Sequence, residues 1–326
     1  MIVARNGSGD FKTLQEAIDF IPENNSDRVE IHIKNGVYKE KISVNKPFVT
    51  LIGEEAKETI LTFEDYADKL FSSGDKYGTF NSYSIIVTGD DFTAEKITFE
   101  NSSGDGRKVG QAVATYVDAD RIVFRNCRFL GCQDTIFTAP LPPKTKDGKD
   151  FNGSRAGQIK RKLRQYFENC YIRGDIDFIF GSATALFDNC EIYSNDRKEA
   201  VNGYITAAST PEGEKYGYVF LNCRLTSNAS PETVYLGRPW RDFAKTVFIN
   251  TWMGDHIKSE GWHNWDKENA EKTVLYGEYN SYGPGAKTDK RAKWSKLFTD
   301  KEALEYTIEN ILKGHDNWNP SQVETQ

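Results

Sequence analysis

Two aspartates occupy the same place relative to a repeated motif. Asp134 lies ten residues after Phe124, and Asp177 lies ten residues after Phe167; each phenylalanine begins a Phe-x-Asn segment. If the two segments are equivalent coils of a repeating fold, the carboxylates are neighbours on adjacent strands, about 4.8 Å apart. Two carboxylates this close cannot both ionise easily, so one is expected to act as an acid and the other as a base or nucleophile.

An arginine and two glutamines complete a set of groups that could hydrolyse an ester. Arg238 lies ten residues before a later copy of the motif, as Asp177 does, so we expect it on the same face. One coil intervenes, and the long arginine side chain can bridge about two strand spacings. Gln133 adjoins Asp134, and Gln111 lies in the preceding coil. A carboxylate nucleophile, an acid/base partner and amide donors for an oxyanion suit acyl transfer.

The motif that carries these residues occurs six times. Its phenylalanines are Phe99, Phe124, Phe167, Phe187, Phe220 and Phe248. Their spacings fit a unit of roughly 20 to 25 residues with insertions at loops. The alternating apolar residues that follow each copy predict short strands, with no helix in each repeat. The sequence therefore predicts an all-β chain, a parallel β-helix whose coils stack on one another.

Four cysteines follow the asparagine of the motif and share one phase of the repeat. They are Cys127, Cys170, Cys190 and Cys223. We expect them to form a buried internal column, and the asparagines to form a ladder at a tight turn. Cys132 falls outside this column. No cysteine belongs to a C-x-x-C motif or a Cys/His cluster, so we expect no structural zinc. The acyl-transfer chemistry described above requires neither a metal nor an organic cofactor.

Both open ends of such a solenoid need a cover. A capping box at Thr13 and Glu16 predicts a short helix over the N-terminal end. A second capping box at Thr299 and Glu302 predicts a C-terminal capping helix over about 299–313, with Leu304 on its apolar face. No linker or shift in composition divides the chain, so residues 1–326 are expected to form one domain.

Composition excludes several classes of protein. The net charge of -6 and the pI near 5.5 argue against a nucleic-acid partner, and no run of 18 apolar residues is present to span a membrane. The N-terminus shows no signal-peptide pattern. Localisation thus stays open: we expect a cytoplasmic protein if the chain is complete and a secreted one if a leader has been removed.

Five motifs in a fixed order resemble those of the pectin methylesterases, the carbohydrate esterases that demethylate homogalacturonan. They are Gly36-Val-Tyr-Lys-Glu40, Gly110-Gln-Ala-Val-Ala114, Gln133-Asp-Thr-Ile-Phe137, Asp177-Phe-Ile-Phe-Gly181 and Leu236-Gly-Arg-Pro-Trp240. The segments near Gly7 and Trp318 are also similar, so the resemblance spans nearly the whole chain. It implies a single-stranded right-handed parallel β-helix, a pectin lyase-like solenoid, that acts as a monomer on methyl-esterified homogalacturonan or oligogalacturonides.

The resemblance also implies a role for each site residue. Asp177 would attack the ester carbonyl, Asp134 would protonate the departing methanol and then activate water, and Arg238 would orient Asp177. Gln111 and Gln133 would stabilise the oxyanion. The substrate-binding residues expected beside them are Trp240, which would stack on a sugar ring, Trp262, for which packing on the exterior is nearly as plausible an interpretation, and Phe178.

Residues 139–163, between the two aspartates, exceed what the repeat needs and form a predicted insertion loop. The stretch from Lys144 to Arg164 carries eight basic residues against two acids. The basic residues are Lys144, Lys146, Lys149, Arg155, Lys160, Arg161, Lys162 and Arg164. We expect this loop to border the groove and to attract an anionic substrate, although a flexible solvated loop is an equally good interpretation.

Two other functions are compatible with the residues alone. A glycoside hydrolase acting on polygalacturonate could use the same two carboxylates, because retaining glycosidases place theirs about 5 Å apart. A non-catalytic β-helix that binds sugar needs neither. The paired glutamines favour the esterase, since an oxyanion needs N–H donors.

Overall fold

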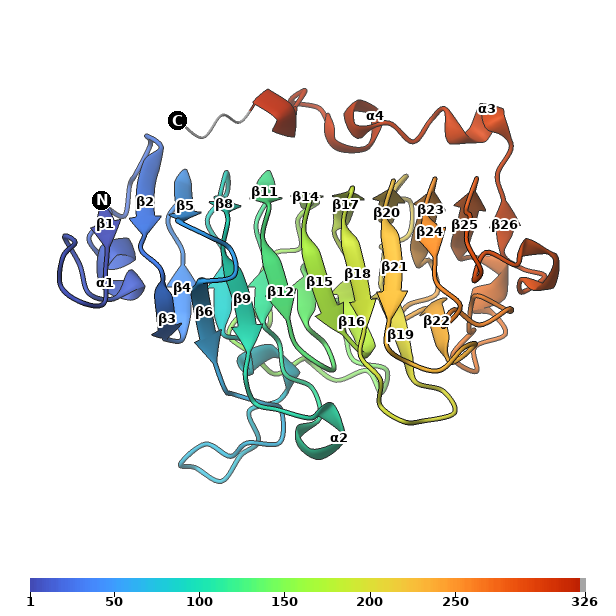
Figure 1. Ribbon diagram of the computed structural model, residues 1–326, viewed down its shortest axis with the longest axis horizontal. Helices are drawn as coiled ribbons and strands as arrows, with labels where there is room; N and C mark the ends of the chain where they lie inside the picture. The colour runs from blue at the N-terminus through green and yellow to red at the C-terminus, as the bar shows by residue number, and fades with distance from the viewer. Residues whose placement is uncertain (323–326) are drawn as a thin grey trace.

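Three parallel sheets wind around a common interior along the length of the molecule (Figure 1). In the computed structural model, which describes residues 1–322, every pairing between strands of these sheets is parallel. From β2 to β24 successive strands enter the three sheets in turn, so each of these circuits adds one strand to each sheet. The prediction of a right-handed parallel β-helix is confirmed.

The largest sheet has eleven strands in the order β1 (Ile2–Val3), β2 (Val29–Ile33), β5 (Val49–Gly53), β8 (Thr93–Glu95), β11 (Ile122–Arg125), β14 (Arg164–Glu168), β17 (Thr184–Asp188), β20 (Tyr218–Leu221), β23 (Lys245–Ile249), β25 (Leu275–Tyr279) and β26 (Lys296–Leu297). The second has eight: β3 (Gly36–Lys39), β6 (Thr59–Phe63), β9 (Thr98–Asn101), β12 (Arg128–Leu130), β15 (Tyr171–Gly174), β18 (Glu191–Ser194), β21 (Arg224–Ser227) and β24 (Trp252–Met253). The third has seven: β4 (Ile42–Val44), β7 (Ile85–Val87), β10 (Thr115–Val117), β13 (Ile136–Thr138), β16 (Ile176–Gly181), β19 (Gly203–Ala208) and β22 (Val234–Gly237).

An internal stack of phenylalanine rings fixes the register of the largest sheet. Phe124, Phe167, Phe187, Phe220 and Phe248 are direct partners on consecutive strands, and their ring centroids lie 4.5–5.0 Å apart. Such stacked aromatic pairs add to the stability gained from burial. The remaining copy of the motif, which comes first in the sequence, does not belong to this stack: Phe99 lies on β9 of another sheet and pairs with Phe129.

The residues that follow the phenylalanines form the predicted turn and column. Asn169 and Asn189 both adopt left-handed backbone conformations, and the Asn189 amide donates to the Asn169 side-chain oxygen at 2.6 Å. Asparagine tolerates this conformation better than most residues. The four cysteines behind the turn are buried free thiols, as the sequence predicts, while Cys132 is half-buried outside the column.

Short helices flank the sheets. They are α1 (Leu14–Asp19), α2 (Gly106–Val109), α3 (Asp300–Ala303) and α4 (Ile308–Leu312). The capping box of Thr13 and Glu16 is formed, and α1 buries Leu14, Ala17 and Ile18 at the N-terminal end of the core. The predicted N-terminal cover is therefore confirmed.

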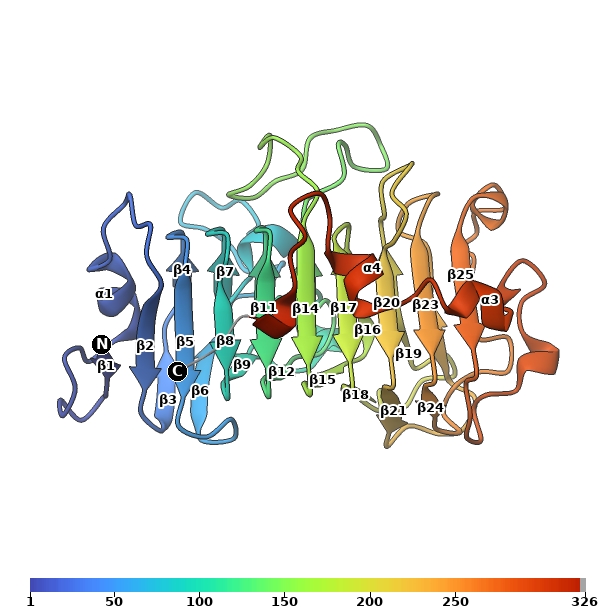
Figure 2. The same ribbon diagram turned by 90° about the horizontal axis from the view of Figure 1, so that it is seen from above.

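The C-terminal segment differs from the predicted capping helix over 299–313. The capping box at Thr299 is formed, but α3 ends at Ala303, because Thr307 takes an extended conformation and caps a second helix, α4. Leu304, expected on an apolar face, has 74% of its surface exposed. The segment does not cover the end of the solenoid but runs back along the outer face of the eleven-stranded sheet (Figures 1 and 2).

The apolar outer face of the eleven-stranded sheet explains the course of the C-terminal segment. Alternate residues of the sheet, among them Val123, Leu186 and Val219, point outward and are apolar. Ile311 and Leu312 of α4 pack against them and are buried. Covering this surface is favourable because it removes apolar area from water.

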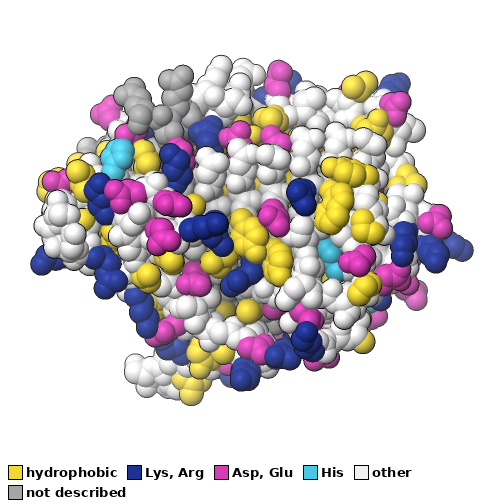
Figure 3. All heavy atoms as spheres, viewed as in Figure 1, with side chains coloured by type: hydrophobic (Ala, Val, Ile, Leu, Met, Phe, Trp, Pro, Cys, Tyr) yellow, Lys and Arg dark blue, Asp and Glu magenta, His cyan; other side chains and the backbone are white. Residues whose placement is uncertain are grey.

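Residues 139–163 contain no strand or helix and project beyond the sheets between β13 and β14, as the green loops of Figure 2 show. Lys, Arg, Asp and Glu side chains are interspersed over the face seen in Figure 3, without a broad field of one sign. Within residues 1–322 no helix is long and apolar enough to cross a membrane.

Candidate active site

The two aspartates lie at the starts of neighbouring strands of the seven-stranded sheet. Ile136 of β13 pairs with Ile179 of β16, so Asp134 and Asp177, each two residues earlier, occupy equivalent positions. The Asp134 N–H donates to the Ile176 carbonyl at 3.0 Å, which keeps the two turns in contact. Both aspartates adopt left-handed backbone conformations, with φ of 64° and 50°, and both are 7% exposed. The structure therefore brings these carboxylates together, as their shared phase predicts.

Arg238 holds Asp177 through two hydrogen bonds. Its Nε donates to Oδ1 at 2.8 Å and its Nη2 donates to Oδ2 at 2.6 Å. Such a bidentate pair fixes the orientation of the carboxylate as well as its charge. The guanidinium carbon also lies 3.8 Å from the ring centroid of Tyr204 and 3.7 Å from that of Trp265. Arg238 is thus held in place by two aromatic rings and a carboxylate.

The register prediction for Arg238 is wrong in detail, although the contact is found. Gly237 pairs with Thr206, and Thr206 pairs with Ile179. Arg238, the next residue, is therefore aligned with Phe180 across the sheet and not with Asp177. A register shift between β16 and β19 contributes to the offset. The arginine side chain compensates by reaching back across the intervening β19.

The two carboxyls differ in proton affinity because only Asp177 is hydrogen-bonded to Arg238. Burial raises the pKa of Asp134 well above the ordinary value, and the neighbouring Asp177 raises it further. Burial also raises the pKa of Asp177, but here the hydrogen bonds and charge of Arg238 act in the opposite direction. The proton is therefore held preferentially by Asp134, and Asp177 is the carboxyl that ionises first.

The two glutamines lie beside the aspartates. The Ala112 N–H donates to the Gln133 carbonyl at 3.1 Å, so the coils carrying Gln111 and Gln133 are adjacent at this turn. Both side chains are partly exposed, and within residues 1–322 neither amide forms a hydrogen bond. Their side-chain N–H groups are therefore not engaged by other described residues.

Aromatic side chains form one wall beside this constellation. Trp240 is half-buried and lies 6.4 Å from Phe80 and 6.0 Å from Phe151, measured between ring centroids. Phe151 belongs to the insertion and Phe80 to the loop before β7, so both loops border the outer face of the seven-stranded sheet. The contact of Trp240 with a sugar ring stays a prediction.

Two predicted substrate contacts are wrong. Phe178 is completely buried in the interior of the solenoid, because successive residues of a strand face opposite sides and Asp177 faces outward. Trp262 is 3% exposed and stacks on Tyr276 inside the core, with ring centroids 4.5 Å apart. Strand alternation could have excluded Phe178, whereas no repeat pattern covers Trp262. The tryptophan that contacts Arg238 is Trp265, three residues further along the chain.

The charge of the insertion is largely neutralised by acids that are distant in the sequence. Six of the eight basic residues form ion pairs, and four of these reach acids outside the insertion. The four pairs are Arg155–Asp118, Arg161–Asp90, Lys162–Glu214 and Arg164–Asp120. Within residues 1–322 only Lys146 and Lys160 of the eight lack an ion pair. A local count of charges therefore overstates the attraction of this loop for anions.

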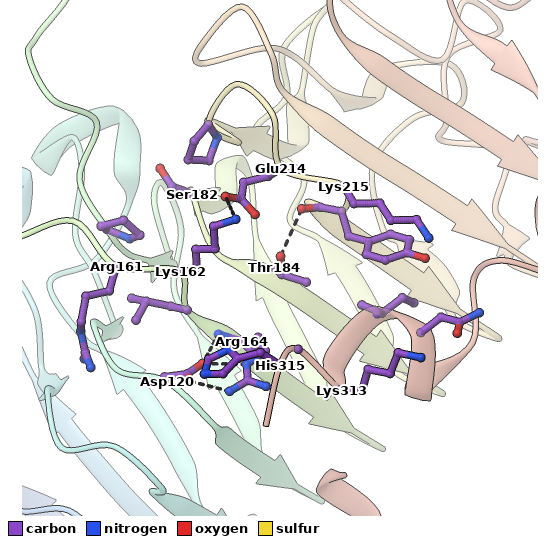
Figure 4. Close-up of a pocket in the computed structure, with 17 residues that line it drawn as sticks. Asp120, Arg161, Lys162, Arg164, Ser182, Thr184, Glu214, Lys215, Lys313 and His315 are labelled. Atoms are coloured by element: carbon purple, nitrogen blue, oxygen red, sulfur yellow. Dashed lines mark hydrogen bonds and ion pairs between the residues drawn. The ribbon is translucent and has the colours of Figure 1, made fainter. Parts of the chain in front are cut away.

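A cavity of about 750 Å³ lies between the insertion and the C-terminal segment (Figure 4). Two of its basic side chains form ion pairs within the lining or with the C-terminal segment, Lys162 with Glu214 and Arg164 with both Asp120 and Asp316. The site residues Asp134, Asp177, Gln111, Gln133 and Arg238 do not line it. Among the described residues no group of three or more His, Cys, Asp or Glu side chains could hold a metal ion.

Comparisons with known proteins agree with this architecture. A family model described as Pectinesterase matches residues 1–141 and 150–315. Pectinesterase 31 of Arabidopsis thaliana is 40% identical over 308 residues, which cover 92% of this chain and 88% of the relative.

Solved structures are similar over nearly the whole length. A pectin methylesterase from carrot superposes with a TM-score of 0.82 at 32% identity, covering 100% of this chain and 96% of the other. A pectin methylesterase in complex with hexasaccharide VII gives a TM-score of 0.79 at 32% identity, covering 98% and 97%. The chain belongs to the pectinesterase family, a family of carboxylic ester hydrolases.

Proposed function

We propose that this chain hydrolyses the methyl esters of galacturonate units in pectin, releasing methanol and leaving free carboxylates. The observation that carries the proposal is the bidentate pair between Arg238 and Asp177 next to the more strongly protonated Asp134. Similar proteins named pectin methylesterases, one of them in complex with a hexasaccharide, support this substrate class.

In the first half of the reaction an oxygen of Asp177 attacks the ester carbonyl carbon and forms a covalent bond. The carbonyl oxygen becomes an oxyanion, which accepts hydrogen bonds from the amides of Gln111 and Gln133. The intermediate then collapses, the bond to the methoxy oxygen breaks, and Asp134 supplies the proton with which methanol leaves. An acyl-enzyme on Asp177 remains.

In the second half the roles reverse. Asp134, now ionised, takes a proton from water, and the hydroxide attacks the acyl carbon. Collapse of this second oxyanion frees galacturonate and restores the Asp177 carboxylate, which Arg238 again stabilises. Arg238 keeps Asp177 ionised at the start of the cycle, while Asp134 begins it protonated, in line with the order of their pKa values.

Methanol and reducing ends, measured together, test the function. The protein is expected to release methanol from methyl-esterified pectin without producing new reducing ends; new reducing ends without methanol would indicate a glycoside hydrolase instead. Asp177→Asn is expected to lower the rate by roughly 1,000-fold or more, because the nucleophile is lost. The exposed Asp255→Asn is the matched control and is expected to keep full activity. Normal methanol release by Asp177→Asn would contradict the mechanism.

A further inference from the structure

The segment between β24 and β25 holds two successive residues in the left-handed backbone conformation. Trp265 and Asp266 both have a φ of 56°. A bulky side chain rarely adopts this conformation, which persists only where surrounding contacts fix it. The indole of Trp265 lies on the guanidinium of Arg238, so the contacts that fix this turn also act on the proposed active site.

Two side-chain acceptors stabilise the turn. The Trp265 N–H donates to His263 Nδ1 at 2.9 Å. The Asp266 N–H donates to Asn264 Oδ1, also at 2.9 Å. Each bond spans two residues, which is how a side chain fixes a turn in its own backbone. The His263 N–H in turn donates to the Gly237 carbonyl at 3.1 Å and anchors the turn to the end of β22.

The imidazole of His263 also contacts the second ring that holds Arg238. Its ring centroid lies 5.7 Å from that of Tyr204, with an angle of 71° between the two planes. The guanidinium carbon of Arg238 lies 3.8 Å from the ring centroid of Tyr204 and 3.7 Å from that of Trp265. A displaced indole removes one of these two contacts and loosens the guanidinium whose hydrogen bonds orient Asp177.

Only the neutral form of His263 can hold Trp265 in this way. An imidazole nitrogen accepts a hydrogen bond only when it carries no proton. Because Nδ1 accepts from the Trp265 N–H, the proton of the neutral ring is on Nε2. Protonation of Nδ1 would turn an N–H group toward the backbone N–H of Trp265, and the hydrogen bond would be lost.

The charges around His263 favour its neutral form at pH 7. Burial lowers the pKa of His263 from 6.5, Asp266 opposes this effect, and the positive charge of Arg238 lowers the pKa further. Burial raises the pKa of Tyr204 and of Tyr235, whose ring centroid lies 5.1 Å from that of His263, so both tyrosines are uncharged near neutral pH. The charged side chains near Tyr235 are Lys258 and Glu260.

We propose that His263 is a positioning residue for the reaction: its neutral imidazole holds Trp265 against Arg238, and its protonation releases the indole. The inference rests on the proposed function and adds a pH dependence to it. Because Arg238 orients Asp177, loss of the indole contact lowers the rate at which the ester is attacked. Activity therefore falls as pH falls through the pKa of His263, in addition to the loss caused by protonation of Asp177.

Two substitutions separate the hydrogen bond of His263 from its ring contacts. His263→Phe keeps an aromatic ring beside Tyr204 but offers no acceptor to the Trp265 N–H. His263→Asn loses the ring but keeps an acceptor, since the Asn264 side chain already spans two residues in the same turn. At about pH 7.5, kcat of His263→Phe is expected to be about 2- to 10-fold below that of the wild type, the effect of one hydrogen bond. The kcat of His263→Asn is expected to match the wild type.

The same comparison at about pH 5 distinguishes positioning from simple packing. The wild type has then lost the hydrogen bond itself, so His263→Phe matches it, and His263→Asn exceeds it by about 2- to 10-fold. The requirement for ionised Asp177 is common to all three proteins. His32→Asn is the matched control, because His32 is an exposed residue of β2, near the N-terminal end of the solenoid, and its kcat equals that of the wild type at both pH values.

The backbone amide of Trp265 gives a readout that does not depend on activity. Its NMR resonance is expected to move with the titration of His263 in the wild type and to stay in place in His263→Asn. Ratios of kcat that do not change with pH, or a Trp265 resonance that does not follow His263, would overturn this role while methanol release by the wild type still stood. A wild type that released no methanol would overturn the proposed function and the role of His263 together.

Discussion

Replacing Arg238 by lysine separates the geometry of its contact with Asp177 from its charge. The native guanidinium makes two hydrogen bonds to the carboxylate, at 2.8 and 2.6 Å, and lies against Tyr204 and Trp265. An ammonium group can make one of these bonds at most in the same direction, and it loses the planar contact with the rings. A hydrogen bond between charged groups contributes about 1.5–3 kcal/mol. We therefore expect kcat of Arg238→Lys to fall by about 10- to 150-fold.

The pH profile provides a second measurement on the same variant. Because burial raises the pKa of Asp177 and Arg238 opposes it, weakening the pair raises that pKa further. Activity that requires ionised Asp177 is lost as pH falls through its pKa, so the acid limb of the kcat profile moves to higher pH in Arg238→Lys. Arg224→Lys, which changes an arginine stacked on Trp252 away from the site, is the control. A variant with native kcat and an unmoved acid limb would refute the role given to Arg238.

Two further outcomes concern stability. Burial raises the pKa of Asp134 in the folded state, so its favourable contribution is present below the ordinary carboxyl pKa of 3.8 and is lost as pH rises through the raised value. Asp134→Asn should therefore unfold at a higher temperature than the wild type at pH 7 but not near pH 3. At pH 7 its free energy of unfolding should be higher by about 1.4 kcal/mol for each unit by which the pKa of Asp134 is raised. A lower melting temperature of the variant at pH 7 would contradict this. Trp262→Phe should lower the melting temperature, because it leaves a cavity beside Tyr276, without changing KM for pectin; a raised KM would place Trp262 in the groove after all.

The pairing of the two aspartates is predictable from the sequence because a parallel β-helix turns spacing into position. Once Phe124 and Phe167 are recognised as equivalent, every residue at the same offset from them shares a place on adjacent strands. The same reasoning places Arg238 several residues away from its ladder position in the structure, since a register shift between β16 and β19 is not visible in the spacing. Arg238 nevertheless contacts Asp177, because an arginine side chain is long enough to reach back across the offset.

Features that depend on tertiary partners could not be predicted in this way. The insertion looks strongly basic in the sequence, but Asp90 and Asp118, which neutralise Arg161 and Arg155, come from earlier coils. The course of the C-terminal segment depends on the apolar outer face of a sheet whose strands are spread over most of the chain. Trp262 and Trp265 lie where the repeat has ended, so no periodicity distinguishes the buried ring from the one near Arg238.

The C-terminal segment, which runs back along the outer face of the eleven-stranded sheet, affects how the β-helix is expected to unfold. In a stack of coils each coil contacts only its neighbours, so a stack can fray from one end in small steps. Here Asp316 forms ion pairs with Arg121 and Arg164, and Tyr279 donates a hydrogen bond to Asp300. The C-terminal segment therefore connects the last coils, which carry Tyr279, to the middle coils, which carry Arg121 and Arg164. Fraying at the C-terminal end is coupled to the middle of the molecule, and the stack is expected to melt as a single cooperative unit.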